Sequence, residues 1–225
     1  MKAYFFDMDG TLFDSMARHA WSWSETLKRH GMHFPPERCY VNEGRTGADT
    51  VAIMIRETVH PEATEQEKHD IYQEKAELFR QQGDSLPMAG VKEVLDYLHE
   101  QPDTQIWIVT GSGQQSLFDT LNLHFPGIFT RERMITAYDV AHGKPNPEPY
   151  LKAWEKSGLR KEDCIVVENA PLGVRSAKAA GLTCYAVNTG PLPDSMLWDE
   201  GADKVFRNMY EMKEMMRQRR FVVDN

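Results

Sequence analysis

The sequence predicts an α/β protein, with a doubly wound parallel-sheet core into which a block of helices is inserted. Short apolar runs that suit strands buried on both faces alternate with segments of helical period, and polar residues follow each run. This alternation stops between about residues 16 and 83, where helical patterns are separated by prolines. We therefore expect a core domain of residues 1–15 and 84–225, and a helical cap domain of residues 16–83.

The first expected element is a strand at Ala3–Phe6, four apolar residues followed by two carboxylates, Asp7 and Asp9. Residues at i and i+2 of a strand share a side, so both carboxylates converge at its carboxyl end, where open α/β sheets bind ligands. Gly10 permits a tight turn, and Thr11 offers a hydroxyl and an amide to an anion. Two close carboxylates repel each other unless a proton or a cation lies between them. An acidic turn without function is the alternative, and three later segments disfavour it.

The insert is expected to contain three helices, near 16–30, 49–58 and 65–82. Because it follows the loop of the first strand, it would lie over the carboxyl end of the sheet as a lid that closes on substrate and excludes water. The apolar positions that define the faces of the second and third helices are Val51, Met54, Ile55, Val59, Ile71, Leu78 and Phe79. The prolines that mark the breaks are Pro35, Pro36, Pro61 and Pro87.

Three further strands are expected in the core, at 105–109, 164–167 and 183–187, and each runs into polar residues. Helices are expected at 91–98, at 172–180 with Gly181 as its C-terminal cap, and at 209–216 as a packing helix. The polar residues that follow the strands are Thr110, Gly111 and Ser112, then Glu168 and Asn169, then Asn188, Thr189 and Gly190.

Composition limits the classes of function. The 225 residues carry a net charge of −8, which argues against nucleic acid as a partner. No run of 18 apolar residues occurs, so we expect no membrane span. The first strand begins almost at the N-terminus, so we expect no leader segment. The three cysteines have no metal-like spacing, so we expect buried thiols in a reducing cytoplasm. We also expect a monomer.

Lys144, within the run Gly143–Pro147, completes a set of four elements with Asp7/Asp9, Thr110–Ser112 and Glu168–Asn169. Taken singly, each has an ordinary explanation, such as a loop lysine, a turn or a helix cap. Taken together, the Asp-x-Asp-Gly-Thr and Gly-Lys-Pro-x-Pro signatures and their order resemble the haloacid dehalogenase superfamily of phosphotransferases over nearly the whole chain. The position of the insert resembles the β-phosphoglucomutase-like branch with its helical C1 cap.

The resemblance implies a phosphoryl-transfer site that uses Mg²⁺. Asp7 would be the nucleophile that forms an aspartyl-phosphate, and Asp9 the general acid and base. A carboxylate attacks an anionic phosphate only once charge is neutralised, and oxygen ligands suit Mg²⁺. The remaining implied residues are Thr110 and Lys144 for catalysis, Gly10, Gly111, Ser112 and Asn146 for substrate binding, and Asp7, Asp9, Glu168 and Asn169 for the metal.

One position departs from the pattern, because the branch usually has two acidic residues where this chain has Glu168 and Asn169. Glu43 lies in the loop before the second expected helix of the cap. It can replace the missing carboxylate by reaching the metal, or it is a solvated acidic residue of that loop. Arg45 binds a distal phosphate or pairs with a cap carboxylate. In mutases the arginine for that phosphate is expected two residues further on, where Gly47 lies. The combination of Glu43, Arg45 and Asn169 resembles pyrophosphatase-type members of the branch.

We therefore expect a Mg²⁺-dependent phosphohydrolase that acts on a small phosphorylated substrate, with inorganic pyrophosphate favoured. The alternatives are a β-phosphoglucomutase and a sugar-phosphate phosphatase. His19 and Lys75 match positions where β-phosphoglucomutases use a histidine and a cap lysine, although both also suit ordinary positions on helices. A non-catalytic binding module on the same fold is a further alternative. Asp9, Gly10 and Thr11 favour phosphate chemistry over dehalogenation, which has no leaving oxygen to protonate.

Overall fold

The computed structural model describes residues 1–57, 63–113 and 117–223, with the backbone alone for 57 and 219–223. A six-stranded parallel sheet forms its centre, in the order β3-β2-β1-β4-β5-β6. This topology confirms the predicted α/β class. The strands are β1 (Lys2–Phe6), β2 (Thr104–Val109), β3 (Met134–Ile135), β4 (Cys164–Glu168), β5 (Thr183–Val187) and β6 (Lys204–Phe206).

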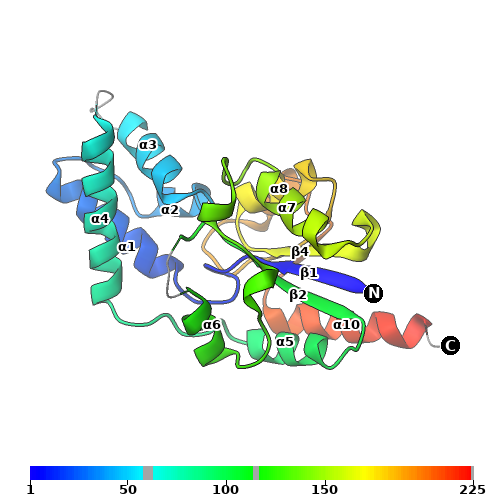
Figure 1. The fold of residues 1–225 in the computed structure, drawn as a ribbon. Helices are drawn as coiled ribbons and strands as arrows, with labels where there is room; N and C mark the ends of the chain where they lie inside the picture. Colours follow the sequence, from blue (N-terminus) through cyan, green and yellow to red (C-terminus); the bar gives the residue numbers. More distant parts are fainter. Residues whose placement is uncertain (58–62, 114–116, 224–225) are drawn as a thin grey trace.

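Helices cover both faces of the sheet (Figure 1). Tyr4 and Phe6 of β1 point to a core shared with α5 and α10, whereas Ala3 and Phe5 point to a core shared with α7, α8 and α9. Both sets of β1 side chains are buried, as its continuous apolar run predicts. The core helices are α5 (Val91–His99), α6 (Leu117–His124), α7 (Glu148–Ser157), α8 (Pro171–Ala179), α9 (Asp194–Asp199) and α10 (Met209–Val223), with single turns at Arg131–Arg133, Ala137–Asp139 and Lys161–Asp163.

The described residues of the inserted segment form four helices, one more than expected. They are α1 (Met16–Arg29), α2 (Glu37–Val41), α3 (Gly47–Glu57) and α4 (Glu65–Gln81). A capping box between Thr64 and Glu67 starts α4. The predicted ends at Thr58, Val59 and Pro61 lie outside the described residues. These helices share a hydrophobic core of their own, made of Ala20, Trp23, Leu27, Met32, Phe34, Cys39, Val51, Met54, Ile55 and Ile71.

The chain crosses between the helical insert and the sheet twice, at about 11–15 and 82–87. The two crossings lie side by side, because the amide of Asp14 donates to the carbonyl of Leu86 at 2.9 Å and Phe13 bridges Pro87. Nearby, the amide of Met88 donates to the carbonyl of Leu12 at 2.8 Å. In Figure 1 the insert lies beyond the carboxyl end of β1, which places it over the predicted site.

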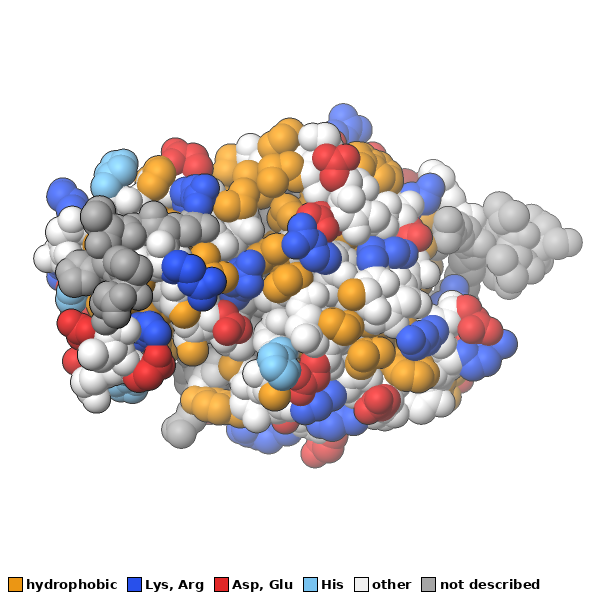
Figure 2. Space-filling model, turned by 90° about the horizontal axis from the view of Figure 1, so that it is seen from above, with side chains coloured by type: hydrophobic (Ala, Val, Ile, Leu, Met, Phe, Trp, Pro, Cys, Tyr) orange, Lys and Arg blue, Asp and Glu red, His pale blue; other side chains and the backbone are white. Residues whose placement is uncertain are grey.

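The buried thiols agree with the expectation from composition. Figure 2 shows acidic and basic side chains interspersed on one face of the molecule. The three cysteines, Cys39, Cys164 and Cys184, are free and buried. Within the described ranges, no helix is both long enough and apolar enough to cross a membrane.

Candidate active site

The site is built from the carboxyl ends of three adjacent strands. Because β1 lies between β2 and β4, the residues at their ends, Asp7, Thr110 and Glu168, meet at one edge of the sheet. Asp7 is still paired with the sheet, as its amide donates to the carbonyl of Val167 at 3.0 Å. The amide of Thr110 likewise donates to the carbonyl of Ile135 at 2.9 Å. The sheet therefore holds the backbone under both side chains rigidly.

Lys144 is the cation at the centre of this edge. Its Nζ donates to Asp7 Oδ1 at 2.5 Å, to Glu168 Oε1 at 2.7 Å and to the carbonyl of Val109 at 3.0 Å. The side chain is 1% exposed. Burial alone would lower the pKa of Lys144, but the charges of Asp7 and Glu168 raise it above its ordinary value. Lys144 is therefore a fixed positive charge rather than a proton donor.

Asp7 has an unusual ionisation, because it is buried among like charges. Burial raises the pKa of Asp7 from 3.8 to about 8, although the charge of Lys144 opposes the shift, and the charge of Glu168 adds to it. A single ammonium therefore does not compensate the negative charge of this edge.

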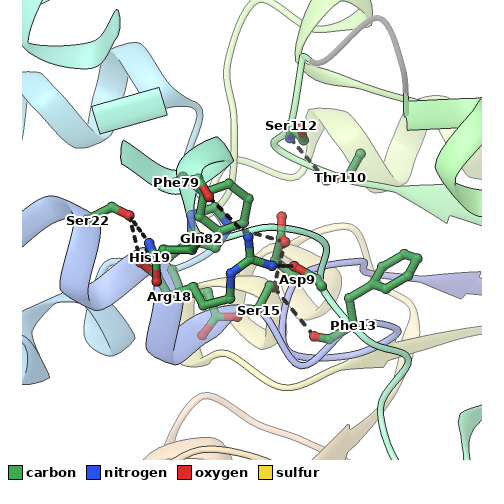
Figure 3. A network of polar contacts seen from close by, with 12 residues as sticks. Asp9, Phe13, Ser15, Arg18, His19, Ser22, Phe79, Gln82, Thr110 and Ser112 are labelled. Carbon is green, nitrogen blue, oxygen red and sulfur yellow. Dashed lines mark hydrogen bonds and ion pairs between the residues drawn. The ribbon is translucent and has the colours of Figure 1, made fainter. Parts of the chain in front are cut away.

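Asp9 lies in a different environment, against helix α1 of the insert (Figure 3). Ser15 Oγ donates to Asp9 Oδ1 at 2.7 Å, and His19 Nε2 lies 3.2 Å from the same oxygen. Burial by itself would raise the pKa of Asp9, but its interaction with His19 and the hydrogen bond from the Ser15 hydroxyl outweigh burial and lower the pKa to about 2. Asp7 and Asp9 thus have opposite shifts: the environment of Asp7 favours its protonated form, and that of Asp9 favours its carboxylate.

His19 links Asp9 to Lys75 of α4. The Lys75 Nζ lies 2.6 Å from His19 Nδ1, and the imidazole stacks on the ring of Phe79 with centroids 4.0 Å apart. Burial and the charge of Lys75 lower the pKa of His19. Burial also lowers the pKa of Lys75, to about 8. A neutral His19 that accepts from Lys75 at Nδ1 can donate from Nε2 to Asp9.

Glu43 of the insert reaches the core through Asn169. The Asn169 Nδ2 donates to Glu43 Oε1 at 2.7 Å, and Thr11 Oγ1 donates to Asn169 Oδ1 at 2.9 Å. Gly10 makes this approach possible, because it has φ +77° and an added Cβ would lie 2.1 Å from Asn169 Nδ2. Burial raises the pKa of Glu43 well above its ordinary value, although the Asn169 hydrogen bond opposes the shift.

The loop at 43–47, here called the cap loop, packs directly on glycines of the core. A Cβ added at Gly111 would lie 2.6 Å from the carbonyl oxygen of Arg45. A Cβ added at Gly143 would lie 2.8 Å from Thr46 Cγ2 and 3.0 Å from the Thr46 amide nitrogen. Real Cβ atoms do not approach backbone so closely, so these glycines let the insert close over the strand ends.

The closed insert encloses a cavity of about 110 Å³. Nine of the residues expected at the site line it: Asp7, Asp9, His19, Glu43, Arg45, Lys75, Thr110, Gly111 and Ser112. Lys144, Glu168 and Asn169 contact that set from outside the lining. Asn146 is placed elsewhere, because its Oδ1 accepts from the amide of Glu148 at 2.9 Å and so caps the start of α7.

The donor set at this edge fits a hard divalent cation. Asp7, Asp9, Glu43 and Glu168 interact electrostatically, and burial raises the pKa of Asp7 and of Glu43, with the neighbouring carboxylates adding to both shifts. In the part of the chain that the structure describes, no three His, Cys, Asp or Glu side chains form a ready metal-ligand cluster. Asn169 and the main-chain carbonyl of Asp9 would therefore have to complete an all-oxygen set, as Mg²⁺ prefers.

Sequence reasoning missed three residues that support the site. Ser15 donates to Asp9, Thr189 Oγ1 donates to the carbonyl of Gly10 at 2.6 Å, and the Tyr150 hydroxyl donates to Glu168 Oε1 at 2.7 Å. Thr189 follows β5, so the rule that polar residues gather at strand ends could have identified it. Tyr150 carries a weaker signal, as one of the buried positions of α7 together with Ala153 and Ser157.

Comparison with known proteins decides the family. A model of the haloacid dehalogenase-like hydrolases matches residues 1–181. The chain belongs to the haloacid dehalogenase-like hydrolases. Hexitol phosphatase A of Escherichia coli is 31% identical, over 83% of this chain and 83% of that protein. A fructose-1-phosphate phosphatase of Escherichia coli is 26% identical, over 81% of this chain and 94% of its own length.

Solved structures place the chain within that family. A protein from Bacteroides vulgatus, provisionally assigned as a β-phosphoglucomutase, is 46% identical and superposes with a TM-score of 0.91. The match covers 96% of this chain and 88% of that one. These comparisons confirm the predicted β-phosphoglucomutase-like branch, and the two Escherichia coli relatives are phosphatases of a hexitol phosphate and a sugar phosphate.

Proposed function

We propose that the protein is a Mg²⁺-dependent phosphatase that hydrolyses a small phosphorylated substrate through an aspartyl-phosphate on Asp7. The observation that carries this proposal is the buried Asp7 carboxylate, held by Lys144 at 2.5 Å and facing a cavity that Asp9 also lines. An Asp7 oxygen attacks phosphorus while the bond to the leaving oxygen breaks. Water then attacks the same phosphorus, and the bond to Asp7 breaks to release phosphate.

Asp9 moves the protons in both steps. Its carboxyl gives a proton to the leaving oxygen in the first step and takes one from the attacking water in the second. A bound phosphoryl group is a nearby like charge, which would raise the pKa of Asp9 from its low value of about 2. Ser15 and His19 fix the orientation of the Asp9 carboxyl throughout.

Mg²⁺, when bound, neutralises the charge of the phosphoryl oxygens that repel Asp7. Asp7, the Asp9 carbonyl, Asn169 and Glu43 or Glu168 would hold it. Thr110, Gly111 and Ser112 line the cavity beside Asp7 and would contact the phosphoryl oxygens. Lys144, which contacts Asp7 from outside the cavity lining, supplies a fixed positive charge.

A sugar or polyol phosphate monoester is the substrate class that we favour. The named relatives act on phosphates of this class. The cap side of the cavity also suits such a leaving group, since Asn42 and Thr50 are polar while Trp23 and Phe79 are aromatic. The expectation that pyrophosphate is the main substrate has no support from these relatives.

The decisive test is Asp7→Asn, which removes the nucleophile but keeps the size of the side chain. We expect Mg²⁺-dependent phosphate release from an aryl phosphate to fall by at least about 1,000-fold, with circular dichroism unchanged. Asp14→Asn is the matched control, because Asp14 is an exposed carboxylate in the first crossing, and it should keep full activity. Substantial turnover by Asp7→Asn would end the nucleophile assignment.

Inorganic pyrophosphate is a second candidate, which one contact favours. Glu43 Oε1 accepts from Asn169 Nδ2 at 2.7 Å and so brings a cap carboxylate towards the proposed metal site. Glu43→Gln should then reduce pyrophosphate cleavage more than aryl phosphate cleavage, whereas Glu37→Gln, an exposed acid on α2, should change neither. Equal losses on both substrates would remove this candidate.

The mutase alternative differs only in where the phosphoryl group goes. His19 and Lys75 line the cavity, and the Bacteroides vulgatus relative is provisionally assigned as a β-phosphoglucomutase. With β-glucose 1-phosphate as substrate, a phosphatase releases inorganic phosphate while a mutase forms glucose 6-phosphate. We expect phosphate release to dominate, and a coupled assay for glucose 6-phosphate measures the ratio.

A further inference from the structure

We propose that Tyr150 is a positioning residue of the phosphoryl-transfer site: by sharing Glu168 with Lys144, its hydroxyl keeps the Lys144 ammonium on Asp7. This inference rests on the proposed function, since Lys144 matters only if Asp7 accepts a phosphoryl group. Tyr150 lies on α7, contributes nothing to the cavity lining and would touch neither substrate nor metal.

The alternation of β4 explains why Tyr150 reaches the site. Cys164 and Val166 face the core shared with α7 and α8, and Glu168 faces the same side because alternate residues of a strand share a face. The Glu168 carboxylate therefore points at α7, where Tyr150 is fully buried and donates to Oε1 at 2.7 Å. The same ring lies under the Lys144 ammonium, with Nζ 4.9 Å from its centroid.

The hydrogen bonds of Glu168 show what the hydroxyl does. Its Oε1 accepts from Tyr150 and from Lys144 at 2.7 Å each. Its Oε2 accepts from the amides of Asn169 at 3.0 Å and Ala170 at 3.3 Å. Both oxygens thus have two donors, and the carboxylate cannot turn without losing some of them.

Lys144 divides its ammonium between Asp7 and Glu168. Without the phenol hydroxyl, Glu168 Oε1 would keep Lys144 as its one side-chain donor among the described residues. A buried carboxylate that loses a donor binds the remaining cation more tightly. The ammonium would shift from Asp7 towards Glu168, which leaves Asp7 and the transferring phosphoryl group with less positive charge.

Tyr150→Phe tests this directly, because it removes the hydroxyl and keeps the ring under Lys144. The matched control is Tyr97→Phe, which removes a tyrosine hydroxyl that donates to the carbonyl of Met216 at 3.5 Å on the other face of the sheet. With an aryl phosphate and saturating Mg²⁺, we expect kcat of Tyr150→Phe to fall at least about tenfold, with KM within about twofold. Tyr97→Phe should match the wild type.

Inhibition by vanadate and by inorganic phosphate gives a readout that a merely structural role would not move. Vanadate imitates the transition state, so its inhibition constant should rise by about the same factor as kcat falls, while that of phosphate stays within about twofold. All constants are compared below each variant's melting temperature, so lower stability alone does not change the outcome.

Two results would overturn the inference. One is a kcat of Tyr150→Phe within about twofold of Tyr97→Phe. The other is an equal weakening of vanadate and phosphate inhibition, which would mean a general loosening of the site. Wild-type enzyme without Mg²⁺-dependent phosphate release would instead refute the proposed function, so the two failures are distinguishable.

Discussion

At the scale of single residues, the site combines buried carboxylates with too little positive charge. Asp7, Glu43 and Glu168 interact electrostatically around the single ammonium of Lys144, and burial raises the pKa of Asp7 to about 8. A folded protein that holds a proton on Asp7 loses stability once that proton must leave. The charge imbalance therefore has a measurable consequence for stability.

In the absence of divalent cations, we expect the melting temperature to fall as pH rises from about 4 to about 8. The folded state binds a proton at Asp7 up to about pH 8, whereas the unfolded chain releases it near 3.8, so unfolding becomes more favourable across that window. Asp7→Asn should reduce the slope, and saturating Mg²⁺ should flatten it. Differential scanning fluorimetry with a chelator and with Mg²⁺ measures both, and parallel slopes for wild type and Asp7→Asn would contradict the assignment.

At the scale of elements, closure depends on contacts between the cap loop and core glycines. Gly143 has no room for a side chain, because an added Cβ would lie 3.0 Å from the backbone nitrogen of Thr46. Thr46 cannot move freely, since its hydroxyl accepts from the Asp49 amide at 3.2 Å and its carbonyl accepts from the Thr50 amide at 2.9 Å at the start of α3. A methyl group at 143 would therefore displace Thr46, and with it the start of α3, from its place against the core.

Gly143→Ala should lower kcat/KM by about tenfold or more while the core keeps its fold. Gly190→Ala is the control, because Gly190 also faces the insert but an added Cβ would meet Tyr40 at an ordinary 3.5 Å. Steady-state kinetics and circular dichroism on both variants measure the difference. Full activity of Gly143→Ala would show that catalysis does not require the cap loop to pack closely against residue 143.

The sequence predicts the elements with clear periodicity and misses the short ones. Strands β1, β2, β4 and β5 and helices α1, α3, α4, α5 and α8 agree with expectation to within about two residues. β3 has two residues and β6 three, which is too short for alternation to be seen. α7 begins at Glu148, directly after the Gly143–Pro147 motif, whose prolines predict a loop. The sequence pattern therefore does not identify Tyr150.

The sequence likewise predicts some residues of the candidate site and leaves others undetermined. Asp7, Thr110 and Glu168 were placed together because parallel strands end at one edge of the sheet, which the topology confirms. Glu43 and Arg45 depend on how the insert folds back, and no sequence period encodes that packing. The functional roles of Glu43 and Arg45 remain predictions, and Glu43→Gln tests that of Glu43.

At the scale of the whole molecule, the joint between the insert and the sheet is narrow and held by Arg18 of α1. Its guanidinium donates to Ser85 Oγ at 2.6 Å and to the Phe79 carbonyl at 3.0 Å, and it lies 4.5 Å above the ring of Phe79 (Figure 3). A further bond reaches the carbonyl of Gly83. One side chain thus ties α1 to the end of α4 and to the second crossing.

Arg18→Met should make the second crossing, residues 82–87, several-fold more sensitive to limited proteolysis, because it removes these hydrogen bonds and keeps much of the apolar stem. Arg80→Met is the control, since Arg80 is exposed and pairs with Glu77 on the surface of α4. Mass spectrometry of the fragments locates the cut. Equal cleavage of both variants would show that Arg18 does not secure the joint.

The adjacency of the two crossings has a consequence for the evolution of such proteins. Since Asp14 and Leu86 are hydrogen-bonded neighbours, a short turn joining these two positions would bridge the gap left by excision without disturbing any strand. Inserted domains of quite different size and shape could be accommodated at the same two positions. Chemistry anchored in the sheet could then persist unchanged while new substrates were acquired by exchanging the part that encloses them.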